Sequence, residues 1–109
     1  MEIKKISEFS STGAPLYDMR VILNKTGKHE IVKFSVITFE PHVRVPETGE
    51  SVHEEDEYSF FIDGALYTQS GATQADVSAG DVTLIPAGER HFCENRSDEK
   101  CTLVCVMVK

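Results

Sequence analysis

Hydrophobic and polar residues alternate in short runs through most of the chain, most regularly between Ile31 and Phe39. In an extended strand, successive side chains project to opposite faces. One face of this run holds Val32, Phe34, Val36 and Thr38, and the other holds Ile31, Lys33, Ser35, Ile37 and Phe39. We therefore predict a half-buried β-strand over Ile31–Phe39.

Other short apolar runs are separated by turn residues, and no long segment has helical period. The further predicted strands are Arg20–Leu23, His42–Val45, Tyr58–Ile62, Ala65–Gln69, Gln74–Val77, Val82–Ile85, His91–Asn95 and Thr102–Val108. We place a turn at Asn24–Lys28 and expect a short edge strand or a helical turn within the first nineteen residues. Many short strands with tight turns are typical of a barrel or sandwich, so the predicted fold class is all-β.

The dipeptide Asp63-Gly64 separates two of these predicted strands, Tyr58–Ile62 and Ala65–Gln69. Glycine adopts the positive φ that two-residue turns require, and Asp-Gly between hydrophobic runs favours a hairpin. We therefore expect these two strands to pair.

Length and charge restrict the organisation and the partners. The 109 residues suit one folding unit, which we place at 1–109. Eleven Lys and Arg against eighteen Asp and Glu give a net charge of −7, which repels phosphate backbones and anionic lipid surfaces. No apolar run approaches the roughly 20 residues of a membrane helix. We expect a small-molecule partner and neither nucleic acid nor membrane.

The N-terminal sequence MEIKKISEF lacks the continuous apolar core of a signal peptide, so we expect a cytoplasmic protein. In that compartment the three cysteines, Cys93, Cys101 and Cys105, are expected as thiols.

Two segments concentrate side chains that bind metals. His53 and Glu57 are four residues apart, an even separation that places both on the same face of an extended chain. Farther along, the turn Pro86-Ala87-Gly88 leads to His91 at the start of a predicted strand. The first pair can form a two-ligand clamp, to which His91 can add a third ligand.

The second segment resembles the second signature motif of the cupin superfamily: Gly, five residues, Pro, one, Gly, two, His, three, Asn. All five positions are occupied, over residues 80–95, by Gly80, Pro86, Gly88, His91 and Asn95. The resemblance implies a small RmlC-like conserved barrel, the double-stranded β-helix or jelly roll.

The cupin first motif, placed at about residues 45–64, is matched in part. His53, Glu57 and Gly64 occupy motif positions, while Ser51 stands where the motif has its leading His and Val45 where it has its leading Gly. The resemblance implies that His53, Glu57 and His91 converge on one divalent transition metal.

Two imidazoles and a carboxylate leave coordination positions open and suit Fe, Mn, Ni or Zn better than Ca or Mg. A Ser hydroxyl is a poor ligand for these metals, so Ser51 is expected to leave its place to water or to accept a hydrogen bond from it. Some cupins have lost ligands and bind no metal, and a metal-free barrel is therefore an alternative.

Four residues are candidates for the pocket around this site. Ser51 occupies a motif position, and Cys93 lies two residues after His91, on the same side of the strand. Arg90 could hold an anionic substrate. Tyr58 follows Glu57 and by alternation faces away from it, which favours a packing role. Outside these segments, His42 is an alternative to the missing ligand, although an exposed edge position is more usual for such a histidine.

These observations support three hypotheses. The first is a metal-dependent dioxygenase, isomerase or lyase that acts on a small polar or carboxylated molecule. The second is a module that binds a sugar or sugar acid without chemistry, and the third is a metal-free barrel with a structural role. The apolar run Thr102–Val108, taken as an edge strand, suggests a homodimer.

Overall fold

The computed structural model describes residues 8–25 and 32–109, and within these ranges, apart from Glu8 in a 3-10 turn, the regular structure consists of β-strands. The nine strands are β1 (Tyr17–Lys25), β2 (Val32–Phe39), β3 (Arg44–Val45), β4 (Asp56–Asp63), β5 (Ala65–Ser70), β6 (Thr73–Ser78), β7 (Val82–Ile85), β8 (His91–Glu94) and β9 (Cys101–Val108). None of the described residues belongs to a helix long and apolar enough to cross a bilayer.

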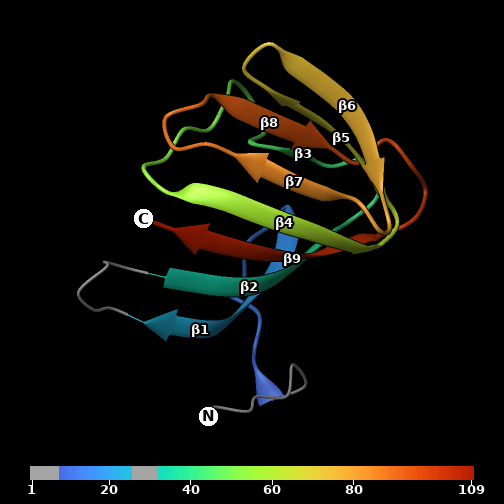
Figure 1. The fold of residues 1–109 in the computed structure, drawn as a ribbon. Helices are drawn as coiled ribbons and strands as arrows, with labels where there is room; N and C mark the ends of the chain where they lie inside the picture. Colours follow the sequence, from blue (N-terminus) through green and yellow to red (C-terminus); the bar gives the residue numbers. More distant parts are fainter. Residues whose placement is uncertain (1–7, 26–31) are drawn as a thin grey trace.

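The strands form two antiparallel sheets (Figure 1). One sheet has the order β1-β2-β9-β4-β7, and the other has the order β3-β8-β5-β6. Strands that are far apart in sequence are therefore neighbours, as when β9 pairs with both β2 and β4. The all-β prediction is confirmed, and the sheets form the double-stranded β-helix expected from the motifs.

The core lies between the sheets, and alternation along each strand decides which side chains enter it. Phe61 is 3% exposed while Phe60, one residue earlier on β4, is 48% exposed. From the facing sheet, Leu66 joins Phe61, Leu103 and Cys105 in one buried cluster. The prediction that Tyr58 faces away from Glu57 is confirmed, because Tyr58 is 44% exposed on the face of Phe60 while Glu57 shares the inner face of Phe61.

The predicted hairpin at Asp63-Gly64 is wrong. β4 pairs with β7 and β9, whereas β5 pairs with β6 and β8 in the other sheet. The glycine has the expected positive φ of 80°, but here the chain turns a corner from one sheet into the other. An added Cβ at Gly64 would meet the backbone of Lys100 and lie 2.8 Å from Cys101 Cα, so only glycine fits this corner.

The prediction that Thr102–Val108 is an edge strand is also wrong, because β9 lies between β2 and β4 in the middle of its sheet. The N-terminal edge strand is β1, which begins at Tyr17. In the predicted His42–Val45 strand only Arg44–Val45 is extended, since His42 has a φ of 61°. The predicted turn at Asn24–Lys28 begins within β1, and its remainder lies outside the described residues, as does Ile31.

Candidate metal centre

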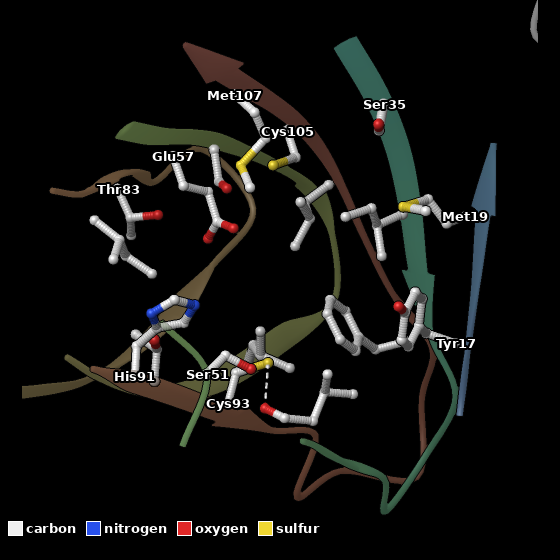
Figure 2. A pocket seen from close by; sticks show the side chains of 18 of the residues that line it. Tyr17, Met19, Ser35, Ser51, Glu57, Thr83, His91, Cys93, Cys105 and Met107 are labelled. Atoms are coloured by element: carbon white, nitrogen blue, oxygen red, sulfur yellow. Dashed lines mark hydrogen bonds between the residues drawn. The ribbon is translucent and has the colours of Figure 1, made fainter. Parts of the chain in front are cut away.

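Three side chains from the two sheets meet at one end of the space between them. His53 precedes β4, Glu57 lies on β4, and His91 begins β8. Each offers a ligand atom, and these three atoms lie within 4.8 Å of one another. In Figure 2 the side chains of Glu57 and His91 face each other across this end of the pocket. The structure thus brings together the three residues expected from the motifs.

Backbone hydrogen bonds hold the segments that carry the histidines. Ser51 and His91 exchange two of them, with N···O distances of 2.8 and 2.9 Å. The N–H of Gly88 donates to the carbonyl of His53 at 2.8 Å. The loop before β4 is therefore attached at Ser51 to the first residue of β8 and at His53 to the turn before β8, which fixes the separation of the two imidazoles.

Each imidazole is oriented by a main-chain carbonyl. Nδ1 of His53 lies 2.9 Å from the carbonyl oxygen of Glu55, and Nδ1 of His91 lies 2.9 Å from that of Glu89. A carbonyl can only accept, so each Nδ1 donates its proton, and in the neutral ring Nε2 keeps its lone pair. Metal-binding histidines are commonly oriented in this way.

The lone pair of His53 has no ordinary partner. His53 Nε2 is buried and without a hydrogen-bond partner, and Oε1 of Glu57 lies 3.5 Å away, beyond normal hydrogen-bond length. A buried acceptor beside a carboxylate is costly unless a cation lies between them. Ligands held at 2.0–2.2 Å from one metal are separated by about 3.0–3.4 Å, which His53 Nε2 and Glu57 Oε1 nearly meet at 3.5 Å, while the widest pair of the three, within 4.8 Å, must close by up to about 1.4 Å. The three residues therefore fit a divalent metal.

A cavity of about 280 Å³ extends from these ligand atoms between the sheets. Its lining is mainly aliphatic, aromatic and sulfur-containing, and includes the buried core residues Phe39, Phe61, Leu66 and Leu103. Figure 2 shows Glu57, Thr83 and His91 at one end and Tyr17 and Met19 at the other. The cavity thus joins a polar end to a long apolar interior.

Two cysteines line this cavity, and both are weak acids. Burial, followed by the negative charge of Glu57, raises the pKa of Cys93 to about 12, and the same two causes raise the pKa of Cys105 to about 12. The Cys93 thiol faces the carbonyl of Val45 at 3.8 Å. Both side chains are therefore protonated thiols at neutral pH, which agrees with the free cysteines expected from the sequence.

Comparison with known families decides the classification. The family model described as the cupin domain matches residues 35–107, which include both motifs, from Val45 to Asn95. The chain is a cupin. No curated protein sequence matches it.

Solved structures show the same fold at low sequence identity. A protein from Thermotoga maritima described as a predicted oxalate decarboxylase is 21% identical, with a TM-score of 0.80 and coverage of 98% of each chain. KdgF from a Halomonas species is 12% identical, with a TM-score of 0.78 and coverage of 100% of this cupin and 94% of that chain. A Cupin 2 conserved barrel domain protein from Salinispora arenicola is 23% identical, with a TM-score of 0.77 and coverage of 100% and 89%.

The other motif positions of this cupin have structural roles. Gly80 and Gly88 adopt φ values of 94° and 81°. Asn95 is fully buried, and its amide lies within hydrogen-bond distance of three carbonyls, those of Phe39, Glu40 and Glu99. The second motif therefore shapes the turn before His91 and anchors the chain after it.

Of the four predicted pocket residues, Ser51 and Cys93 line the cavity, and Tyr58 and Arg90 do not. Tyr58 is 44% exposed on the outer face of its sheet. The exposed Arg90 side chain lies 3.7 Å from the carboxylate of Glu50, turned away from the site by alternation with His91. His42 is exposed beside Asp98, at 2.6 Å, and does not replace the missing ligand.

Sequence reasoning missed most of the apolar lining. Met19, Ile37 and Met107 come from β1, β2 and β9, outside the segment between the two motifs. The available signal was alternation, since Ile37 shares a strand face with Phe39. Alternation indicates which face of a strand is buried but not which strands pair. The pairing order, which places β9 between β2 and β4, therefore could not be predicted.

Proposed function

We propose that this cupin binds one divalent transition metal through His53, Glu57 and His91 and acts on a small molecule at the open coordination positions. The observation that carries the proposal is the buried Nε2 of His53, which has no hydrogen-bond partner and lies beside a carboxylate. A cation is the group that satisfies both atoms at once.

When bound, the metal supplies a Lewis acid that polarises an oxygen of the ligand. The chain contributes orientation, because the carbonyls of Glu55 and Glu89 hold both imidazoles with Nε2 toward the site. Ser51 lines the cavity and leaves the position of a fourth ligand to water or substrate. A carboxylated substrate suits such a centre, and the Thermotoga neighbour described as a predicted oxalate decarboxylase supports that choice.

Metal analysis of the purified protein tests the proposal. We expect close to one transition-metal ion per chain, retained on dialysis, and a large loss in His53→Ala and His91→Ala. His42→Ala is the matched control, since this histidine is exposed and lies away from the site. A wild-type protein that holds no transition metal, and takes none up on reconstitution, would favour the metal-free barrel.

A non-catalytic ligand-binding module is the second candidate. Apart from the ligand set, the titratable side chains among the described lining residues are Tyr17, Lys33, Cys93 and Cys105. Both thiols stay protonated near neutrality because their pKa values are about 12, and neither suits general base catalysis at that pH. A ligand that raises the melting temperature of the metal-loaded protein without being converted would support this candidate, and turnover would exclude it.

A further inference from the structure

The lining of the cavity restricts the body of its ligand. Beyond the three metal-binding residues, the charged side chain among the described lining residues is Lys33, which is exposed. The remaining polar groups are single hydroxyls, while the larger share of the lining is aliphatic, aromatic or sulfur-containing. A sugar or sugar acid would lose water at many hydroxyls here without gaining matching partners.

The apolar interior is continuous with the core. Leu103 and Cys105 are each 4% exposed and line the cavity, and Met107 on the same strand follows them toward Glu57. At the roughly 30 Å³ that a water molecule occupies in the liquid, 280 Å³ has room for about nine non-hydrogen atoms. Three of these suffice for a chelating head, which leaves about six for an apolar body.

We propose that the ligand of this cupin has an oxygen-containing head that chelates the metal and an apolar body of about six carbons that lies among the residues of β2, β4 and β9. This inference rests on the proposed metal site. It narrows the carboxylated substrate of the proposed function to an amphipathic acid or a similar chelator, and it disfavours the sugar or sugar acid of the second hypothesis.

Three hydroxamates with the same chelating head separate the classes: acetohydroxamate, hexanohydroxamate and gluconohydroxamate. The last two have the same chain length, and one is hydroxylated along the chain. Calorimetric titration of the Zn²⁺-reconstituted protein should show hexanohydroxamate binding on the order of 100-fold more tightly than acetohydroxamate, because each buried methylene adds about fourfold. Gluconohydroxamate should show no such gain. Equal affinities, or a preference for gluconohydroxamate, would overturn the inference.

A pair of variants on β9 locates the effect. Met107→Gln places an amide of similar size in the cavity and should weaken hexanohydroxamate roughly tenfold with little change for acetohydroxamate. Val106→Thr adds a polar group one residue earlier, on the opposite face, and should leave both affinities unchanged. A loss in both variants, or in neither, would contradict a body bound along this wall.

Failure of the metal proposal gives a different result. If the protein takes up no metal, the hydroxamate group has no metal to chelate and none of the three hydroxamates will bind through it. The apolar cavity is then tested on the metal-free protein with hexan-1-ol and glycerol. Chemical-shift changes at Leu103 and Met107 methyls with hexan-1-ol and not with glycerol would support the apolar body. No change with either probe would refute it.

A second and independent observation concerns the outer face of the five-stranded sheet. Tyr58, Phe60 and Ile62 on β4 and Val82 and Leu84 on β7 are between 44% and 69% exposed. They lie in adjacent rows, because Tyr58 pairs with Leu84 and Phe60 pairs with Val82. On the other side of β4 these rows continue onto β9 at Val106 and Val104. We call this surface, from β7 across β4 to β9, the outer apolar face.

We infer that the outer apolar face is the contact between two copies of this chain. Its five exposed side chains and Val108 offer roughly 600 Å² of apolar surface, at the upper limit for a monomer and close to the 800 Å² that each partner of a stable interface hides. Apart from Asp56, which pairs with Val108 at one end, the residues in the rows across β4, β7 and β9 are uncharged, so most of the net charge of −7 lies outside this face. A two-fold contact uses the same patch twice, as a flat apolar sheet allows.

Light scattering coupled to size exclusion tests this inference. We expect a dimer for the wild type and a monomer for Phe60→Lys/Val82→Lys, with the metal content unchanged. Val52→Lys is the matched control. Val52 is exposed to a similar extent, 52% against 48% for Phe60, but it lies next to the site in the loop before β4 rather than on the outer apolar face. A wild-type monomer, or a double variant that remains a dimer, would overturn the inference.

Discussion

Asn95 is the residue of the second motif whose removal should affect stability most. Its side chain is fully buried at the end of β8, and its amide faces the carbonyls of Phe39, Glu40 and Glu99 at 3.3, 3.2 and 2.8 Å. Its oxygen accepts from the N–H and the hydroxyl of Ser97 at 3.1 and 2.9 Å. One side chain thus connects the end of β2, the end of β8 and the loop that leads into β9.

The perturbation is Asn95→Leu, which keeps the number of side-chain heavy atoms and the branching and replaces both polar side-chain atoms by methyl groups. Each hydrogen bond contributes about 0.5–1.5 kcal/mol net, and each buried acceptor left without a partner costs about 1–3 kcal/mol. Since two of the three carbonyls and the Ser97 groups are partly in contact with solvent, we expect a loss of about 3–5 kcal/mol. That is a large part of the 5–15 kcal/mol typical of a domain.

The assay is urea unfolding at pH 7, followed by far-UV circular dichroism. Ser97→Ala is the control, because it removes one hydroxyl and leaves the three carbonyl contacts of Asn95; it should cost less than about 1.5 kcal/mol. Asn95→Asp should cost at least as much as the Leu variant, since it sets a carboxylate against three carbonyl oxygens. A loss below about 1 kcal/mol in Asn95→Leu would refute the reasoning.

Three further predictions concern other parts of the fold. Gly64→Ala should destabilise the protein by several kcal/mol. Gly80→Ala is the control, because Gly80 also has a positive φ but open space around it, and it should cost about 1–2 kcal/mol. Equal losses of the free energy of unfolding in urea would show that the contact with Lys100 is unimportant. The pKa of Cys105 is about 12 in the folded chain against an ordinary value of 9.0, so its stabilising effect is complete below pH 9 and is lost as the pH rises toward 12. The free energy of unfolding should therefore fall in this alkaline range by up to about 4 kcal/mol more in the wild type than in Cys105→Ala, and parallel pH profiles would contradict the burial of the thiol. Arg90→Ala should change the free energy of unfolding by no more than about 0.5 kcal/mol and leave the metal content unchanged, because this exposed side chain does not reach the cavity. A loss of metal on elemental analysis would show that Arg90 contributes to the site.

The sequence predicted those features that depend on neighbours along the chain. Alternation placed Tyr58 on the face away from Glu57, and motif spacing selected the three residues that the structure brings together. Such signals are local, because the pleat and the turn before His91 are set by a few consecutive residues.

Predictions that required knowledge of strand neighbours failed. Gly64 has the positive φ of a hairpin glycine, but the same conformation serves a corner between two sheets, and only the proximity of Lys100 and Cys101 distinguishes the cases. The run Thr102–Val108 is apolar on both faces because β9 is central, with the cavity on one side and the outer apolar face on the other. A strand of this composition cannot be assigned to an edge or a centre from its sequence.

The carbonyl partners of the two histidines have a consequence for how this protein can vary. The groups that orient both imidazoles belong to the main chain at Glu55 and Glu89, so replacing either side chain leaves the orienting oxygen in place. Both positions are thus free to change without rotating a ligand. The ring orientation of the centre is robust to point mutation, and new ligand preferences can evolve through the cavity wall while the three ligands stay as they are.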